Sequence, residues 1–175
     1  EAFDALRWII MRYGESAPFS GNSAQPPYLR VYPTAQVLGT IPSWDWHRAR
    51  LDSARYSAIY HFAQRADALE RLGATGRIAH LAAALDDIPG VGPWSVAEAL
   101  QGFCGHPDAV SVGDYHLAHT VGFAFTGERT DDAGMLGLLA PYAGHRQRVV
   151  RLIQEAGIRK PRYGARISIP DYRDF

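Results

Sequence analysis

The chain has 175 residues and a formal net charge of zero at pH 7, a length that suits one folded domain with a buried core. No apolar run reaches the roughly 20 residues that span a bilayer, and a single cysteine, Cys104, excludes an internal disulfide and a Cys-rich metal or iron–sulfur site. Because nonspecific nucleic-acid binders are usually basic, the neutral balance means that any binding to nucleic acid must come from local features.

Apolar residues recur at helical spacing along most of the chain, and few segments alternate as strands do. The first helix is expected at 2–13, with Phe3, Leu6, Ile9, Ile10 and Tyr13 on one side, and a proline-rich loop follows at 14–33. The later helices are expected at 34–38, 52–65, 67–72, 75–85, 94–103, 114–125, 130–139 and 144–157. Asp52 or Ser53 is the expected N-cap of the helix at 52–65, and Thr75 that of the helix at 75–85. We therefore predict an all-α fold of about eight helices in one domain, 1–175.

The most specific local signal is the segment 85–97, Leu-Asp-Asp-Ile-Pro-Gly-Val-Gly-Pro-Trp-Ser-Val-Ala, where one helix ends and another begins. Gly90 and Gly92 can both adopt positive φ and carry no Cβ, so a phosphate can approach the backbone closely. The N–H groups at the start of the next helix favour an anion, and Ile88 and Val91 are expected to anchor the turn in the core. The pattern predicts a hairpin that binds phosphate without reading bases; the alternative is a plain helical turn.

The hairpin, the motif Val-Ser-Val-Gly-Asp-Tyr-His-Leu at 110–117 and the helix after Gly144 together resemble the helix-hairpin-helix base-excision DNA glycosylases. The resemblance is strongest to the 3-methyladenine DNA glycosylase II type and covers most of residues 40–160. It implies the helix-hairpin-helix DNA glycosylase fold, with the hairpin at 85–97 and the catalytic loop and helix at 110–125. The DNA-binding residues that it implies are Gly90, Val91, Gly92 and Ser95.

Asp114 is the catalytic residue that the resemblance implies. An aspartate before a helix with Leu117, Val121 and Phe125 on its inner face also predicts an N-cap, and the two roles are compatible because a helix N-terminus stabilises an ionised carboxylate. Breaking an N-glycosidic bond makes the sugar cationic, and a carboxylate ~4 Å away at an effective dielectric near 20 stabilises that charge by ~4 kcal/mol, or ~10³ in rate. The carboxylate can also orient or deprotonate the attacking water, once the damaged base has been flipped out of the stack.

Trp94 follows the second hairpin glycine by two residues, where relatives that also nick the strand carry a lysine that forms a Schiff base. The lysine of this chain is Lys160, so the resemblance implies a monofunctional N-glycosyl hydrolase without lyase activity. Trp94 is a candidate to stack on a flipped, alkylated purine, because a cation is attracted to a π face; the alternative is a buried core tryptophan. Tyr115, beside Asp114, is a further candidate for the substrate pocket.

The expected partner is double-stranded DNA that contains a damaged base, bound by a monomeric base-excision repair enzyme in the cytoplasm, at the nucleoid in a bacterium. No metal site is predicted, because no carboxylate stands at a metal-binding spacing from His47, His116, His119 or His145. No cofactor is expected, apart from a monovalent cation of the kind that some members of the family that this chain resembles bind at the hairpin. The tail at 158–175 is locally basic from Arg159 to Arg166. This basic stretch is either a contact for nucleic acid or a solvated tail.

The sequence departs from the resembling family in two respects. A Gly-Gln-rich segment that helps to fill the hole left by the flipped base is not found, nor is an N-terminal β domain, so we expect a chain that is truncated at its N-terminus or lacks this wedge. Gly113 stands where close relatives often have a second acidic residue. Two other functions therefore remain open: a non-catalytic helix-hairpin-helix DNA-binding module or decayed glycosylase, and a helical protein-interaction domain whose hairpin is only a turn. An open pocket joining Asp114 and Trp94 would favour the enzyme.

Overall fold

The structure, a computed structural model, describes residues 2–18 and 29–158. Half of the proline-rich loop (19–28) and the predicted basic tail beyond Ile158 lie outside the described residues. Within them the only β pairing is an isolated bridge between Ser16 and Arg30, so the all-α prediction is confirmed. The elements are α1 (Ala2–Tyr13), α2 (Ala35–Leu38), α3 (Ser43–Arg48), α4 (Ser53–Ala74), α5 (Ile78–Asp86), α6 (Pro93–Cys104), α7 (Leu117–Thr126), α8 (Asp132–Leu139), the 3₁₀ helix η1 (Ala140–Tyr142) and α9 (Arg146–Glu155).

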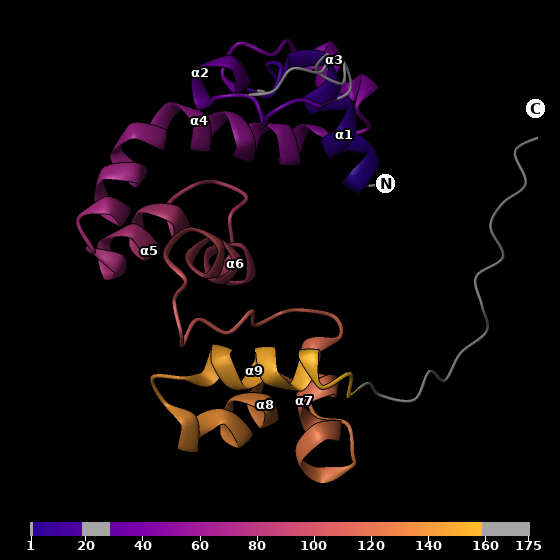
Figure 1. Cartoon of the computed structure of the whole chain (residues 1–175), viewed down its shortest axis with the longest axis vertical. Helices are drawn as coiled ribbons and strands as arrows, with labels where there is room; N and C mark the ends of the chain where they lie inside the picture. Colours follow the sequence, from indigo (N-terminus) through magenta and orange to yellow (C-terminus); the bar gives the residue numbers. More distant parts are fainter. Residues whose placement is uncertain (1, 19–28, 159–175) are drawn as a thin grey trace, which may run out of the picture. The chain divides into compact units, whose positions relative to one another are not determined.

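The chain divides into two compact units, Glu1–His106 and Pro107–Phe175. Figure 1 shows α1 to α6 in the first unit and α7 to α9 in the second. Each unit has a buried apolar cluster of its own. The single domain at 1–175 stays a prediction. No helix in the described part of the chain is long and apolar enough to cross a membrane.

The core of the first unit gathers apolar side chains from α1, α2, α3 and the segments next to them: Ile9, Leu38, Ile41, Trp46 and Ala49. Phe3 was predicted on one side of α1 with Ile9, but it is 86% exposed whereas Ile9 is buried. The face that packs inward carries Ala5 and Ile9, four residues apart. Phe3 lies six residues before Ile9, which places it about 120° around the helix from that face.

α4 is one continuous helix, whereas two helices were predicted at 52–65 and 67–72. Asp52 is its N-cap, as expected, and its carboxylate accepts a hydrogen bond from the Arg55 N–H at 2.9 Å. The prediction of Thr75 as an N-cap is wrong: its hydroxyl donates to the Arg71 carbonyl at 2.7 Å and so closes the C-terminus of α4. A threonine hydroxyl donates as well as accepts, so the residue type alone does not tell which helix end it caps.

α3 was not predicted as a helix, because six residues are too few to show a helical period. It follows Pro42, and its Trp46 is 3% exposed in the core of the first unit. No pattern along the sequence indicates this helix, and the packing of Trp46 in the core holds it in place. Tertiary contact of this kind overrides weak local propensity.

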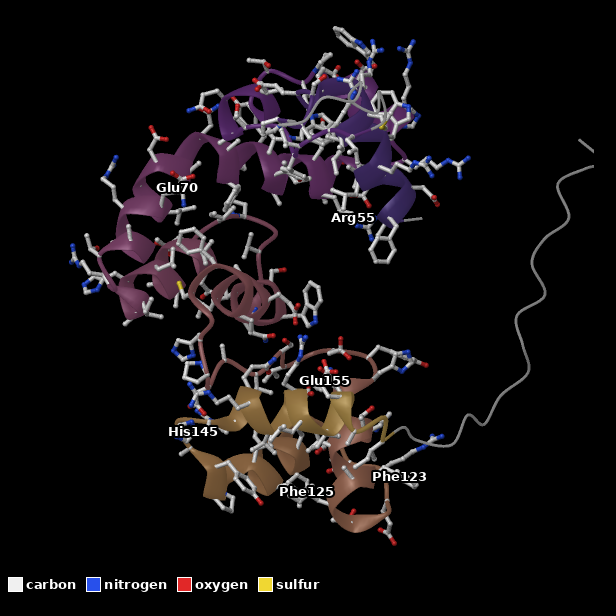
Figure 2. All side chains as sticks on the ribbon, viewed as in Figure 1. Arg55, Glu70, Phe123, Phe125, His145 and Glu155 are labelled. Carbon is white, nitrogen blue, oxygen red and sulfur yellow. The ribbon has the colours of Figure 1, made fainter. Side chains whose placement is uncertain are left out.

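The second unit packs α7, α8 and α9 around seven buried apolar residues: Leu117, Ala118, Val121, Met135, Leu139, Val150 and Ile153. Close approach is needed where α7 meets the following turn, since a Cβ on Gly122 would lie 2.8 Å from the Glu128 carbonyl oxygen. Phe125, labelled in Figure 2, was predicted on the inner face of α7 but is 40% exposed. Its ring centre lies 5.9 Å from that of Tyr142. The helix ends one residue later, at Thr126.

Candidate nucleic-acid interface and catalytic carboxylate

The predicted hairpin joins α5 to α6. It is closed by backbone hydrogen bonds from the Ile88 N–H to the Leu85 carbonyl and from the Val91 N–H to the Ile88 carbonyl, both 3.0 Å. Ile88 is 1% exposed and anchors the turn as expected, whereas Val91 is only half-buried. Gly90 has φ 87°, and a Cβ at this position would lie 3.2 Å from the Cβ of Ala58 in α4. The hairpin therefore rests against α4 at a point where only glycine fits without strain.

Gly92 differs from Gly90. Its φ of −120° and ψ of −178° describe extended backbone that any residue adopts, so the expectation of positive φ holds for Gly90 alone. A Cβ at Gly92 would meet nothing within 4 Å, so the space in front of this backbone is open. Gly92 is also the N-cap of α6 and supplies no side-chain cap. An open, uncapped helix N-terminus is suited to an anion.

The first two turns of α6 carry the other predicted hairpin residues. Trp94 is 44% exposed, so it is not the buried core tryptophan of the alternative interpretation. Ser95 is half-buried on the same turn, and Ala97 is 6% exposed where α6 packs inward. The structure thus places Gly90, Val91, Gly92, Trp94 and Ser95 together, at the start of one helix.

A monovalent cation at the hairpin would be held by backbone carbonyl groups. The carbonyl oxygens of Leu85 and Ile88 each accept one backbone hydrogen bond, which leaves a second lone pair on each oxygen. The hairpin is therefore compatible with the cation that the resemblance allows, and the cation itself stays a prediction.

Asp114 stands in the second unit, three residues before α7. Its Oδ1 accepts hydrogen bonds from the backbone N–H groups of His116 and Leu117, both at 2.8 Å. The N-cap of α7 is His116, and not Asp114 as was predicted, because the helix begins at Leu117; Asp114 nevertheless accepts backbone hydrogen bonds at this helix start as a capping side chain does. Two such donors stabilise the negative charge of the carboxylate and restrict its rotation.

A second aspartate, Asp132, stabilises the turn before Asp114, a role that was not predicted from the sequence. The carboxylate of Asp132, in the first turn of α8, accepts a hydrogen bond from the Gly113 N–H at 3.0 Å. Gly113 has φ 86°, a conformation that residues with a Cβ rarely adopt. The glycine that replaces an acidic residue of the resembling family is thus the residue that this turn requires.

Tyr115 is 84% exposed, and its ring lies 4.6 Å from that of His116 in an edge-to-face arrangement. It therefore presents an aromatic surface directly beside Asp114. Trp94 belongs to the first unit and Asp114 to the second, and the pocket predicted to join them stays a prediction.

The segment that leads to Asp114 is attached to α9 through Asp108. This carboxylate accepts hydrogen bonds from the backbone N–H groups of Gly144 and Arg146, both at 2.9 Å, from Arg146 Nε at 2.8 Å and from Arg146 Nη2. The Arg146 side chain, more than any other group, holds the pKa of Asp108 far below its usual range. The C-terminal helix that contributed to the family resemblance therefore positions the loop on which Asp114 lies.

The first unit also contains a buried carboxylate, Asp45, that was not predicted from the sequence. Asp45 is 2% exposed and accepts hydrogen bonds from the Tyr13 hydroxyl, Arg12 Nε at 3.2 Å and Arg48 Nη1 at 3.2 Å. The Tyr13 hydrogen bond and then the Arg12 guanidinium lower the pKa of Asp45, although burial opposes them. These groups link α1 to α3, so Asp45 has a structural role. An acidic residue between two tryptophans, in Trp44-Asp45-Trp46, was the available signal for its burial.

The histidines lie in separate environments. His119 Nδ1 is 2.7 Å from the Thr130 carbonyl oxygen, His145 Nδ1 is 2.9 Å from Arg148 Nη1, and His116 lies against Tyr115. Over residues 2–18 and 29–158, no group of three or more His, Cys, Asp or Glu could hold a metal ion.

The chain has an all-helical fold of the DNA glycosylase type. A solved structure with this fold, MBOgg1 in complex with a low affinity DNA ligand, matches this chain with a TM-score of 0.65 and 14% sequence identity. The match covers 88% of this chain and 54% of that chain, so this chain spans about half the length of MBOgg1 in that structure. At this identity the likeness shows the fold alone. No protein-family model matches the chain, and no curated protein matches it.

Proposed function

We propose that this protein is a DNA glycosylase that hydrolyses the N-glycosidic bond of a damaged base in base excision repair, with Asp114 as its catalytic carboxylate. The observation that carries the proposal is the restraint of Asp114, whose Oδ1 accepts two backbone N–H groups just before α7. The fold supports it, because a solved structure with the same fold is a DNA complex. Trp94 and Tyr115, both exposed aromatics, are the proposed base-contacting residues.

In this reaction the bond between the sugar carbon and the base nitrogen breaks, and the base leaves with the electron pair. Positive charge grows on the sugar, and a carboxylate that is already held in place stabilises that charge without reorganising. Water adds to the sugar carbon and loses a proton, which the carboxylate can accept. The products are a free base and an abasic sugar, and the target base has to leave the stack for the carboxylate to reach the sugar.

The hairpin of the first unit would supply the DNA contact. A phosphate approaching Gly92 meets open space at the N-terminus of α6, where a helix attracts an anion without reading sequence. Trp94, exposed on the first turn of α6, offers a π face to a cationic alkylated purine. An alkylated purine is therefore the substrate class that we propose.

The enzyme is proposed to be monofunctional. Lyase activity in the resembling family needs an amine that attacks the sugar and forms a Schiff base. Trp94 stands at the position where that lysine would lie, two residues after Gly92. Hydrolysis by water is then the chemistry that remains.

The test measures release of a methylated purine from alkylated duplex DNA by the wild type, Asp114→Asn and Asp131→Asn. Asp131 is the matched control, because it caps α8 through the Gly134 N–H at 2.8 Å in the same unit and asparagine caps nearly as well as aspartate. We expect Asp114→Asn to lower the single-turnover rate by about 10³ with unchanged DNA affinity, and Asp131→Asn to keep the wild-type rate.

Three results would contradict the proposal. Equal rates for the wild type and Asp114→Asn would remove Asp114 from the chemistry. DNA binding without release of any base, by the wild type as well, would support the non-catalytic DNA-binding module instead. An absence of DNA binding even at low salt, where phosphate contacts are strongest, would leave only a helical protein-interaction domain.

A further inference from the structure

Arg50 is the only residue other than glycine with positive φ in the described parts of the chain, at 63°. It stands just after α3, where the Arg50 N–H donates to the His47 carbonyl at 2.8 Å and the Leu51 N–H to the Trp46 carbonyl at 3.0 Å. These bonds close the helix end in the left-handed conformation for which glycine is the usual residue. An arginine here is strained, and such outliers tend to mark functional positions.

The arginines around Arg50 are ion-paired, whereas Arg50 is not. Arg12 and Arg48 are paired with Asp45, and Arg55 is paired with Asp52. The Arg50 side chain is exposed and makes no ion pair with any residue that the structure describes. This group of four arginines and two aspartates therefore has an excess of positive charge, and Arg50 is the member whose guanidinium is available to a ligand.

Arg50 lies just before the part of α4 on which the hairpin packs. The first turns of α4 pack on the hairpin, since a Cβ on Gly90 would lie 3.2 Å from the Ala58 Cβ and 3.7 Å from the Ala54 carbonyl oxygen. Arg55, labelled in Figure 2, marks this end of α4. Arg50 precedes Ala54 by four residues, which span at most about 14 Å. The phosphates of one DNA strand follow each other every ~3.4 Å along the helix axis, so several lie within that span.

We propose that Arg50 binds a backbone phosphate of the DNA strand that the hairpin contacts, and so extends the phosphate-binding surface of the first unit along the α3–α4 connection. This inference rests on the proposed DNA binding. Glycine would close the end of α3 without strain, but only arginine supplies a planar guanidinium that donates two parallel hydrogen bonds to a phosphate. Phosphate binding thus explains why a strained position carries a long, charged side chain.

The experiment compares the wild type with Arg50→Gly, Arg50→Lys and Arg7→Ala. Arg7 is the charge-matched control, an exposed arginine on α1 in the same unit. Affinity for a duplex is measured over a salt series, and the midpoint of thermal unfolding (Tm) is measured for each variant. We expect Arg50→Gly to weaken binding about fivefold at 0.15 M salt and to make the slope of log K against log salt shallower by about 0.9, as for one lost phosphate contact. Its Tm should rise by about 2–4 °C, because glycine relieves the left-handed strain.

Arg50→Lys should keep the wild-type salt slope, since a lysine still neutralises one phosphate, and Arg7→Ala should leave the slope unchanged. The proposal is overturned if Arg50→Gly keeps the wild-type slope while Gly92→Ala weakens binding, because the hairpin then binds DNA without Arg50. It is equally overturned if Arg7→Ala and Arg50→Gly change the slope by the same amount. A wild type that binds no duplex at low salt would overturn the proposed function together with this inference.

Discussion

The two units of this protein build their interiors differently. The first unit buries a carboxylate, Asp45, at 2% exposure among three donors, and has an open, largely apolar pocket of about 550 Å³ lined by residues of α2, α4, α5 and α6. In the second unit Val121, Met135 and Leu139 are each 0% exposed, and the main ion pair, between Asp108 and Arg146, lies at the edge. The interior of the second unit therefore consists mainly of packed apolar side chains. The interior of the first unit combines such packing with the buried hydrogen-bonded carboxylate of Asp45.

This contrast matches the demands of the two candidate sites. A catalytic carboxylate has to be held within about 0.5 Å of its working position, which needs a rigid support. Asp114 leads into α7, whose Leu117 and Val121 belong to the dry core of the second unit. A hairpin that binds phosphate through backbone groups would need less precision, and this hairpin approaches α4 at Gly90. Four predictions test the contrast, and they follow from the largest expected effect to the smallest.

Truncation of Leu139 to alanine should cost about 3–5 kcal/mol of unfolding free energy, because a fully buried leucine leaves a cavity that the neighbouring helices cannot fill. Leu152, 68% exposed in α9, is the matched control, and Leu152→Ala should change the free energy by less than about 0.5 kcal/mol. Urea unfolding curves measure both. Similar losses from the two variants would mean that the second unit does not depend on a dry core.

Asp108→Asn should cost about 1.5–3 kcal/mol, the range for hydrogen bonds that involve a charged group. The neutral amide loses the ionic attraction to Arg146 and cannot accept all the hydrogen bonds that the carboxylate accepts. Glu155→Gln, which removes the exposed pair with Arg151, should have little effect on urea unfolding. A smaller loss from Asp108→Asn than from Glu155→Gln would show that Asp108 does not attach the loop to α9.

Acid should destabilise the protein through both of its paired aspartates. The pKa values of Asp45 and Asp108 lie below their ordinary value of 3.8 in the folded state. Each aspartate therefore adds stability that is fully present above about pH 5 and is lost as the pH falls through its lowered pKa. The fall in Tm between about pH 5 and pH 2.5 should be shallower in Asp108→Asn than in the wild type. Parallel curves for the two proteins would refute this linkage.

Gly92→Ala should leave the unfolding free energy within about 0.5 kcal/mol of the wild type, because its φ suits any residue and a Cβ meets nothing within 4 Å. Gly90→Ala should cost at least about 1 kcal/mol, since φ is 87° there. Gly92→Ala should nevertheless weaken duplex binding, as a methyl group then stands where a phosphate would approach. Fluorescence anisotropy with a labelled duplex measures the affinity. Unchanged affinity would locate the DNA contact away from the hairpin.

Some features could be predicted because their hydrogen bonds close within a few residues. The hairpin was recognisable from Ile88, Gly90 and Gly92, since glycine and proline punctuate helices at fixed places. The hydrogen bonding of Asp114 just before α7 was predictable for the same reason, although its exact place as the N-cap was not. The break expected after Arg65 was wrong, because buried Ala66 and Leu69 hold α4 continuous across it.

The sequence by itself determined the helical class, the hairpin and the placement of an aspartate before α7, because turns and caps form over two to four neighbouring residues. Only the tertiary structure decided which aspartates became ionic links. Asp45 meets Arg12 across 33 residues and Asp108 meets Arg146 across 38, and no pattern along the chain joins residues so far apart. The exposure of Trp94 and the strain at Arg50 were likewise settled by packing, since burial and backbone conformation at one position depend on neighbours that arrive from distant parts of the chain.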